Sequence, residues 1–151
     1  MASEPDELAA NVRGATAALA DMEQQLRTIQ AKVSGLGFFA RGFVEKDIKS
    51  ATGRSFAEWI KAAERVRLSL DNALGGSRTD AVRVITDELP RVTVLRKYLR
   101  NAPKKINMVP AAVLKPQQRV DILHQVDLQD ASLLVLESMM QEISLALSRA
   151  E

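Results

Sequence analysis

The chain has 151 residues, of which 21 are basic and 19 acidic, and it contains no cysteine. This length suits one domain with a sizeable hydrophobic core, and the lack of cysteine excludes disulfides, thiolate nucleophiles and cysteine-ligated metals. Aromatic residues make up only 4% of the chain while helix formers dominate, so we predict an all-α protein. No apolar run reaches the roughly 18–20 residues of a membrane span, and the acidic N-terminus does not resemble a secretory signal. We therefore expect a soluble, cytoplasmic protein, and these observations leave open a peripheral position at a membrane.

The first predicted helix covers about residues 6–33. Its apolar residues recur at alternating steps of four and three, the period of helices that pack in bundles or coiled coils. The interaction seam assigned to this helix consists of Leu8, Val12, Leu19, Met22, Leu26 and Ile29. Such a seam packs either against other helices of the same chain or against a second chain.

Three of the four phenylalanines follow in the stretch SGLGFFARGFVEKD, where the glycines predict a loop. The candidate contact residues here are Phe38, Phe39, Phe43, Arg41, Lys46 and Lys49. The phenylalanines either fold back over the end of the helices as a hydrophobic plug or project, beside the cations, as a wedge for an anionic membrane or a protein partner. We favour the plug, because exposed apolar patches of this size are unusual on soluble monomers.

Two more long helices are predicted, over about residues 56–74 and 78–101. Ser55 and Glu58 form a capping box at the start of the first, and Trp59 is expected to anchor the core. The second contains a proline at position 90, which we expect to kink or split the helix because its ring clashes with a carbonyl one turn earlier.

The remainder of the chain is predicted to form a crossover and two helices. Residues 102–116 contain three prolines and no helical period, which indicates a loop. A short helix over about 117–126 and a long, broadly apolar helix over about 128–149 follow. Together these elements predict a single domain over residues 1–151, four-helix-bundle-like, with long heptad-patterned helices and a Pro-rich crossover segment.

Charge is distributed unevenly along the chain. Residues 41–119 hold seventeen basic and eight acidic residues, whereas residues 120–151 hold one basic and six acidic residues. The basic patch consists of Arg91, Arg96, Lys97, Arg100, Lys104 and Lys105. These cations either pair with the acidic helices or attract phosphate, anionic lipid or an acidic protein. Nucleic acid is the least expected partner, because Tyr98 is the only aromatic residue within the patch that could stack on bases.

The sequence shows no set of residues that defines a chemical reaction. His124 is the only histidine, and it lacks the second histidine or cysteine that an ordinary zinc site needs. No nucleophile pattern and no glycine-rich phosphate loop occurs. We therefore predict no enzyme activity, no catalytic residue, no metal site and no cofactor.

These patterns favour a non-enzymatic helical module for protein–protein interaction or oligomerisation, with the seam of the first helix as its main support. The alternative is peripheral binding to anionic membranes through the Phe-rich stretch over residues 35–43 and the nearby cations. A third interpretation is nucleic-acid binding through the basic segment over residues 91–119.

Overall fold

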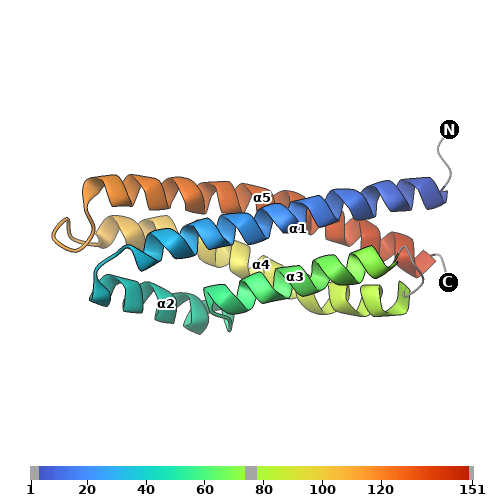
Figure 1. Cartoon of the computed structure of the whole chain (residues 1–151), viewed down its shortest axis with the longest axis horizontal. Helices are drawn as coiled ribbons and strands as arrows, with labels where there is room; N and C mark the ends of the chain where they lie inside the picture. Colours follow the sequence, from blue (N-terminus) through green and yellow to red (C-terminus); the bar gives the residue numbers. More distant parts are fainter. Residues whose placement is uncertain (1–3, 74–77, 150–151) are drawn as a thin grey trace.

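The structure, a computed structural model, describes residues 4–73 and 78–149, with side chains described for residues 9–72 and 79–146. These residues form five α-helices and no strand, which confirms the all-α class (Figure 1). In chain order the helices are α1 (Glu4–Ser34), α2 (Phe38–Thr52), α3 (Phe56–Ala73), α4 (Arg78–Met108) and α5 (Pro116–Arg149). Over the described residues, no helix is long and apolar enough to cross a membrane.

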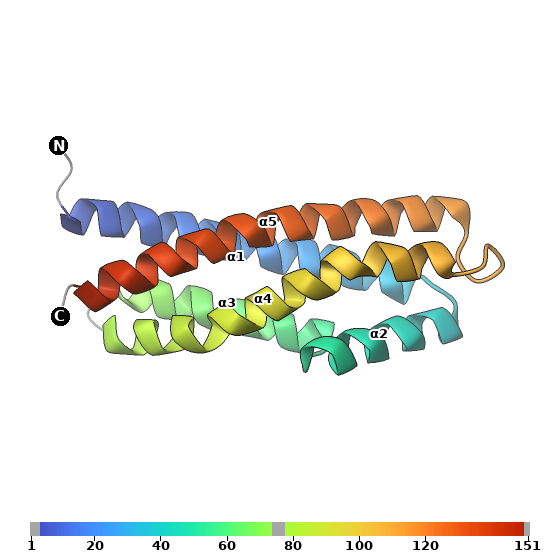
Figure 2. The ribbon, with the colours of Figure 1, turned by 180° about the vertical axis from the view of Figure 1, so that it is seen from behind.

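Four of the helices lie side by side along the molecule. α1 packs against α5 and α3, and α4 packs against the same two helices. α2 is shorter and lies at one end, beyond the start of α3, where it contacts α4 (Figure 2). At that end of the molecule, α2 packs beside α1 and α4, as α3 does elsewhere along the molecule.

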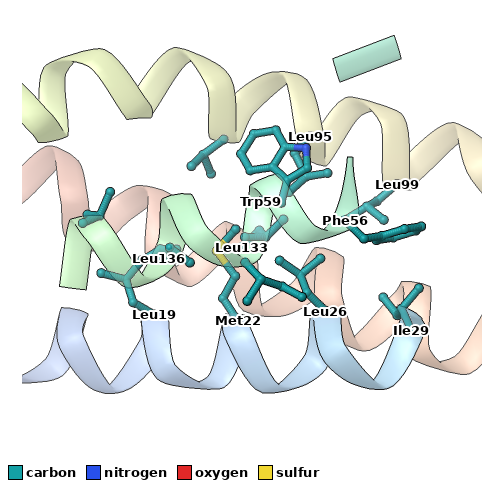
Figure 3. Packing of buried hydrophobic residues seen from close by; sticks show 14 of the residues in the cluster. Leu19, Met22, Leu26, Ile29, Phe56, Trp59, Leu95, Leu99, Leu133 and Leu136 are labelled. Atoms are coloured by element: carbon teal, nitrogen blue, oxygen red, sulfur yellow. The ribbon is translucent and has the colours of Figure 1, made fainter. Parts of the chain in front are cut away.

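One continuous cluster of buried apolar side chains fills the space between these four helices. Figure 3 shows Trp59 of α3, Leu95 of α4, Leu26 of α1 and Leu133 of α5 among its members. Trp59 is 1% exposed, and its indole Nε1 donates a hydrogen bond to Thr52 Oγ1 at 2.9 Å. The prediction that Trp59 anchors the core is confirmed.

The interaction seam of α1 lies inside this core. Its members with described side chains are Val12, Leu19, Met22, Leu26 and Ile29. Each of them is at most 3% exposed, while Leu8 lies outside the described side chains. Over these described residues the seam is thus buried within the chain, where α1 packs against α3 and α5.

The start of α3 agrees with its sequence signals. The amide of Glu58 donates to Ser55 Oγ at 3.2 Å, and the amide of Ser55 donates to Glu58 Oε1 at 3.4 Å. This reciprocal pair confirms the predicted capping box, which satisfies two amides that the helix itself cannot pair. The predicted end of this helix at residue 74 lies outside the described residues.

α4 is longer than the helix predicted over 78–101. It continues through Pro90 and Pro103 to Met108, and Figure 2 shows it changing direction along its course rather than ending. Of the two outcomes expected at Pro90, the split therefore does not occur, and the predicted loop from residue 102 is wrong for residues 102–108, which are helical. Ala102 is buried and Ile106 packs against the core, so apolar burial offsets the hydrogen bonds that the prolines cannot make.

α5 is one helix where the sequence predicted two, over 117–126 and 128–149. Its buried residues continue without interruption at steps of four and three: Ile122, Val126, Gln129, Leu133, Leu136, Met140 and Ile143. The apolar pattern seemed to break because a glutamine, Gln129, occupies one of these core positions. The crossover is correspondingly shortened to residues 109–115.

α2 is a helix where the glycines of the Phe-rich stretch predicted a loop. It begins at Phe38, after Gly37, and ends at Gly53, whose φ of 83° places it in the left-handed region. Gly53 donates its amide to the carbonyl of Lys49 at 2.8 Å, a common way for glycine to end a helix. Ile48 is the one buried residue of this helix, so α2 is only lightly fixed to the rest of the molecule.

Candidate functional site

The three phenylalanines of α2 are exposed to solvent. The exposed fractions are 74% for Phe38, 86% for Phe39 and 60% for Phe43. The inward face of the helix carries Ala40 and Val44 instead, which lead at four-residue steps to Ile48. The predicted hydrophobic plug is therefore wrong: once residues 38–52 are helical, the smaller side chains take the inner face and the phenylalanines lie outside it. We call Phe38, Phe39 and Phe43 the aromatic face.

Basic residues accompany the aromatic face. The rings of Phe38 and Phe39 meet edge to face, with centroids 5.6 Å apart, and the guanidinium carbon of Arg41 lies 5.9 Å from the Phe38 centroid. Lys46 is exposed and has no ion pair among the described residues. Lys49 is partly neutralised, because its Nζ lies 3.0 Å from Oε1 of Glu58.

A cavity of about 550 Å³ lies beneath α2, at the end of the molecule where α2 replaces α3. Apolar residues of all five helices line it, including Val33 of α1, Val44 of α2, Phe56 of α3, Ala102 of α4 and Ile122 of α5. Phe39, Phe43, Met108 and Val113 also line it, and all four of these side chains are exposed. They mark the mouth of what we call the end cavity, which falls in the roughly 300–1,000 Å³ range of small-molecule sites.

The end cavity has one polar corner. Nζ of Lys105 lies 3.0 Å from Oδ1 and 3.2 Å from Oδ2 of Asp47, and 6.0 Å from the centroid of the Tyr98 ring. Burial raises the pKa of the Tyr98 phenol, and the negative charge of Asp47 beside it adds to the shift. The phenol therefore stays protonated at neutral pH, next to a carboxylate that accepts hydrogen bonds.

The crossover loop closes the end cavity on one side, and an arginine of α5 holds it there. The guanidinium of Arg119 donates to the carbonyls of Ile106 and Val109, near the end of α4. The amides of Val113 and Leu114 both bond to the carbonyl of Pro110 at 3.0 Å. Carbonyls at a helix C-terminus have no partner within the helix, so Arg119 satisfies them and fixes the loop.

Much of the predicted basic patch is paired rather than free. Arg96 is buried, with Nη1 2.7 Å from Oε2 of Glu137 and Nε 3.6 Å from Oδ1 of Asp130. Arg100 also reaches Asp130, at 3.8 Å, and Lys105 is paired with Asp47. Arg91, Lys97 and Lys104 remain exposed, without an ion pair within 4 Å among the described residues. Three of its six cations thus join α4 to acidic residues of α5 and α2, and the other three are open to solvent.

Two polar residues that the sequence patterns did not predict to be buried occupy core positions. Glu88 is 2% exposed and Gln129 is 0% exposed. Glu88 follows the buried Ile85 by three residues and precedes the buried Val92 by four, which is the spacing of a core position. A polar residue at a position that the helical period reserves for the core is the signal that finds both residues.

His124 does not form a cluster with its neighbours. It is exposed on α5 and makes no ion pair with Asp121 or Asp127, and Asp121 instead accepts a hydrogen bond from Gln117. Among the described residues, no group of three histidine, cysteine, aspartate or glutamate side chains is placed to hold a metal ion.

Comparison with protein-family models, with curated proteins and with solved structures finds no match to this chain. The function is therefore argued from two neighbouring features of one end of the molecule, the aromatic face of α2 and the end cavity beneath it.

Proposed function

We propose that this protein is a non-enzymatic, four-helix-bundle-like module of long heptad-patterned helices that binds peripherally to anionic membranes through the aromatic face of α2. The observation that carries the proposal is the exposure of all three phenylalanines, 60% or more, on one short helix at the tip of the molecule. Exposed apolar groups gathered in this way are uncommon on soluble proteins and mark a surface that is covered in use.

The apolar contribution to binding is large enough to matter. Removing a phenylalanine side chain from water contributes about 1.5–3 kcal/mol when burial is complete. Three such side chains at the end of an elongated molecule enter a membrane interface together, without rearrangement of the core beneath them. This contribution exceeds what one or two surface ion pairs supply.

The charges near the aromatic face favour an anionic surface. Arg41 and Lys46 lie on the same helix as the phenylalanines, and each basic residue near an anionic membrane contributes about 1 kcal/mol. Because the cytoplasmic leaflet is the anionic one, this preference suits the cytoplasmic location that the sequence predicts. Electrostatic attraction is screened by salt, whereas the apolar contribution is not, so the two are separable by experiment.

Flotation of the protein with vesicles tests the proposal. We expect binding to phosphatidylcholine vesicles that contain phosphatidylserine, weaker binding to phosphatidylcholine alone, and a decrease as salt is raised from low to moderate concentration. The Phe38→Ser, Phe39→Ser double variant should lose binding. A matched control is Leu134→Ser, Val135→Ser, which removes two apolar side chains of α5 that are each 51% exposed.

The control variant should bind like the wild type, and circular dichroism should show that both variants are folded. Absence of binding to anionic vesicles at low salt would refute the proposal. Equal binding by the wild type and the Phe38, Phe39 double variant would also refute it, because the aromatic face would then not be the contact.

Self-association is a second candidate, supported by a different face. Leu134, Val135 and Leu145 of α5 are between 51% and 57% exposed, although they belong to a helix whose other side forms the core. A helix that is apolar on two sides is suited to contacts with two neighbours. Light scattering of the wild type and of Leu134→Ser, Val135→Ser tests this face: a dimer that the double variant dissociates supports it, and a monomeric wild type excludes it.

A further inference from the structure

The end cavity presents a chemistry that surface binding does not explain. The lining of the end cavity is almost wholly apolar, and the residues exposed at its mouth are also apolar. Apolar side chains around a cavity lose packing contacts, and exposed apolar patches are uncommon, so both features lower stability without benefit if only the outer surface is used. We propose that the end cavity binds a single-chain amphiphile with an anionic head, of the fatty-acid class, with the chain among α1, α4 and α5 and the head at Lys105.

The shape of the end cavity suits an extended chain. Along α4 its lining runs from Tyr98 to Met108, a span of about 15 Å at the rise of an α-helix. Along α5 it includes Ile122 and Val126, one helical turn apart on the same side. An apolar chain laid along this direction contacts apolar side chains of several helices at once, and ligand pockets are typically lined by such side chains.

The mouth of the end cavity is built for the entry of an apolar group. Phe39, Phe43, Met108 and Val113 line the cavity and are exposed by 86%, 60%, 82% and 47%. α2 contributes two of them, and Ile48 is its only fully buried residue, although the Asp47–Lys105 ion pair also joins it to α4. It is therefore the helix with the least burial to lose when a chain enters.

The head group is assigned from the polar corner. Lys105 is the only cationic side chain among the described residues that line the cavity. The side chain of Lys105 is 50% exposed while that of its partner Asp47 is 21% exposed, so an approaching head reaches the ammonium first. When Lys105 leaves Asp47 to bind an incoming carboxylate, Asp47 still accepts a hydrogen bond from the Tyr98 phenol. A bond between an ammonium and a carboxylate is of the strong, charge-assisted kind.

Binding is measured without vesicles, so that its failure and the failure of membrane binding are distinguishable. The probes are dodecanoate, dodecanol and dodecylammonium, each below its micellar concentration, followed by calorimetry and native mass spectrometry. We expect one dodecanoate per chain, bound more tightly than dodecylammonium. Phe38→Ser, which does not alter the cavity lining, should leave this binding within about twofold of the wild type while it weakens vesicle binding.

Two variants test the cavity and the head separately. Ala102→Phe places a ring in the cavity and should lower the affinity for dodecanoate and dodecanol by about tenfold or more. The Asp47→Asn, Lys105→Gln double variant should lower only the affinity for dodecanoate, by about tenfold, with Lys104→Gln as the neighbouring control. If Ala102→Phe does not fold, the Asp47→Asn, Lys105→Gln double variant still tests whether the carboxylate head binds at Lys105.

Three results would overturn the inference. One is the absence of a complex with any of the three probes. The second is a folded Ala102→Phe variant that binds as well as the wild type, since the chain would then lie elsewhere. The third is binding of dodecylammonium at least as tight as that of dodecanoate, which would place the head at Asp47 rather than at Lys105.

Discussion

Arg54 and Glu88 form a buried, two-pronged ion pair between the α2–α3 turn and the middle of α4. Nη1 of Arg54 lies 2.7 Å from Oε2 of Glu88, and Nη2 lies 2.8 Å from Oε1. Arg65 of α3 donates to the same carboxylate, and the Arg54 guanidinium carbon lies 4.8 Å from the centroid of the Trp59 ring. Glu88 thus joins α4 both to the α2–α3 turn and to α3. Because α2 leads directly into this turn, the ion pair also positions α2 above the end cavity.

Removal of the Glu88 carboxylate should be strongly destabilising. In Glu88→Ala, the guanidinium of Arg54, whose side chain is 13% exposed, is left buried without its partner. Breaking a buried pair in this way lowers the free energy of unfolding by about 3–5 kcal/mol. Urea unfolding measures the loss, and Asp87→Ala, an exposed neighbour, should change the free energy by less than about 0.5 kcal/mol. Similar stabilities for the two variants would contradict this role of Glu88.

The same carboxylate should make stability depend on pH. Burial alone would raise the pKa of Glu88, but hydrogen bonding from Arg54 and the charges of Arg54, Arg65 and Arg91 outweigh it and hold the pKa below its ordinary value. The pair therefore stabilises the fold fully above about pH 4.3, the ordinary pKa of glutamate, and the contribution is lost as pH falls through the lower, folded-state pKa.

Urea midpoints measured from pH 7 to pH 3 test this dependence. The wild type should lose stability on acidification more steeply than Glu88→Gln, which has no charge to lose at this position. Parallel curves for the two proteins would show that Glu88 does not titrate with a lowered pKa.

The sequence predicts those elements whose signals are local. The capping box of Ser55 and Glu58 places the start of α3, and the spacing from Val12 to Val33 places the buried side of α1. The continuous α5 was missed because Gln129 stands at a core position, and the length of α4 was missed because Pro103 is tolerated where Ala102 and Ile106 pack on the core.

The candidate site depends on packing between distant segments, so the sequence alone could not show it. The phenylalanines were identified as contact candidates, but their exposure follows from the helical phase of α2, which is set by the burial of Ile48. The polar corner unites Asp47 with Lys105, 58 residues apart in the chain. Such a juxtaposition has no local signal in either segment.

Gln129 should limit the stability of the core. Its side chain is 0% exposed, and neither its amide nitrogen nor its amide oxygen has a hydrogen-bond partner among the residues that the structure describes. Burying a polar group without a partner costs about 1–3 kcal/mol. Gln129→Leu, of similar size, should therefore raise the melting temperature by several degrees, at about 2–4 °C per kcal/mol. Gln125→Leu, on a half-buried position one turn earlier, is the control, and an unchanged or lower melting temperature for Gln129→Leu would contradict the prediction.

Two glycines of α2 should respond in opposite ways to the same substitution. Gly42 lies inside the helix with no atom within 4 Å of an added Cβ, so Gly42→Ala should stabilise α2 by about 0.5–1 kcal/mol. Gly53 is equally free of neighbours but has a φ of 83°, so Gly53→Ala should destabilise the end of the helix by about 1–2 kcal/mol. Hydrogen exchange of the α2 amides measures both effects, because a helix with only one fully buried residue, Ile48, opens locally before the core unfolds. Exchange should slow in Gly42→Ala and quicken in Gly53→Ala, and a change of the same sign in both would show that the conformation of Gly53 is not what ends α2.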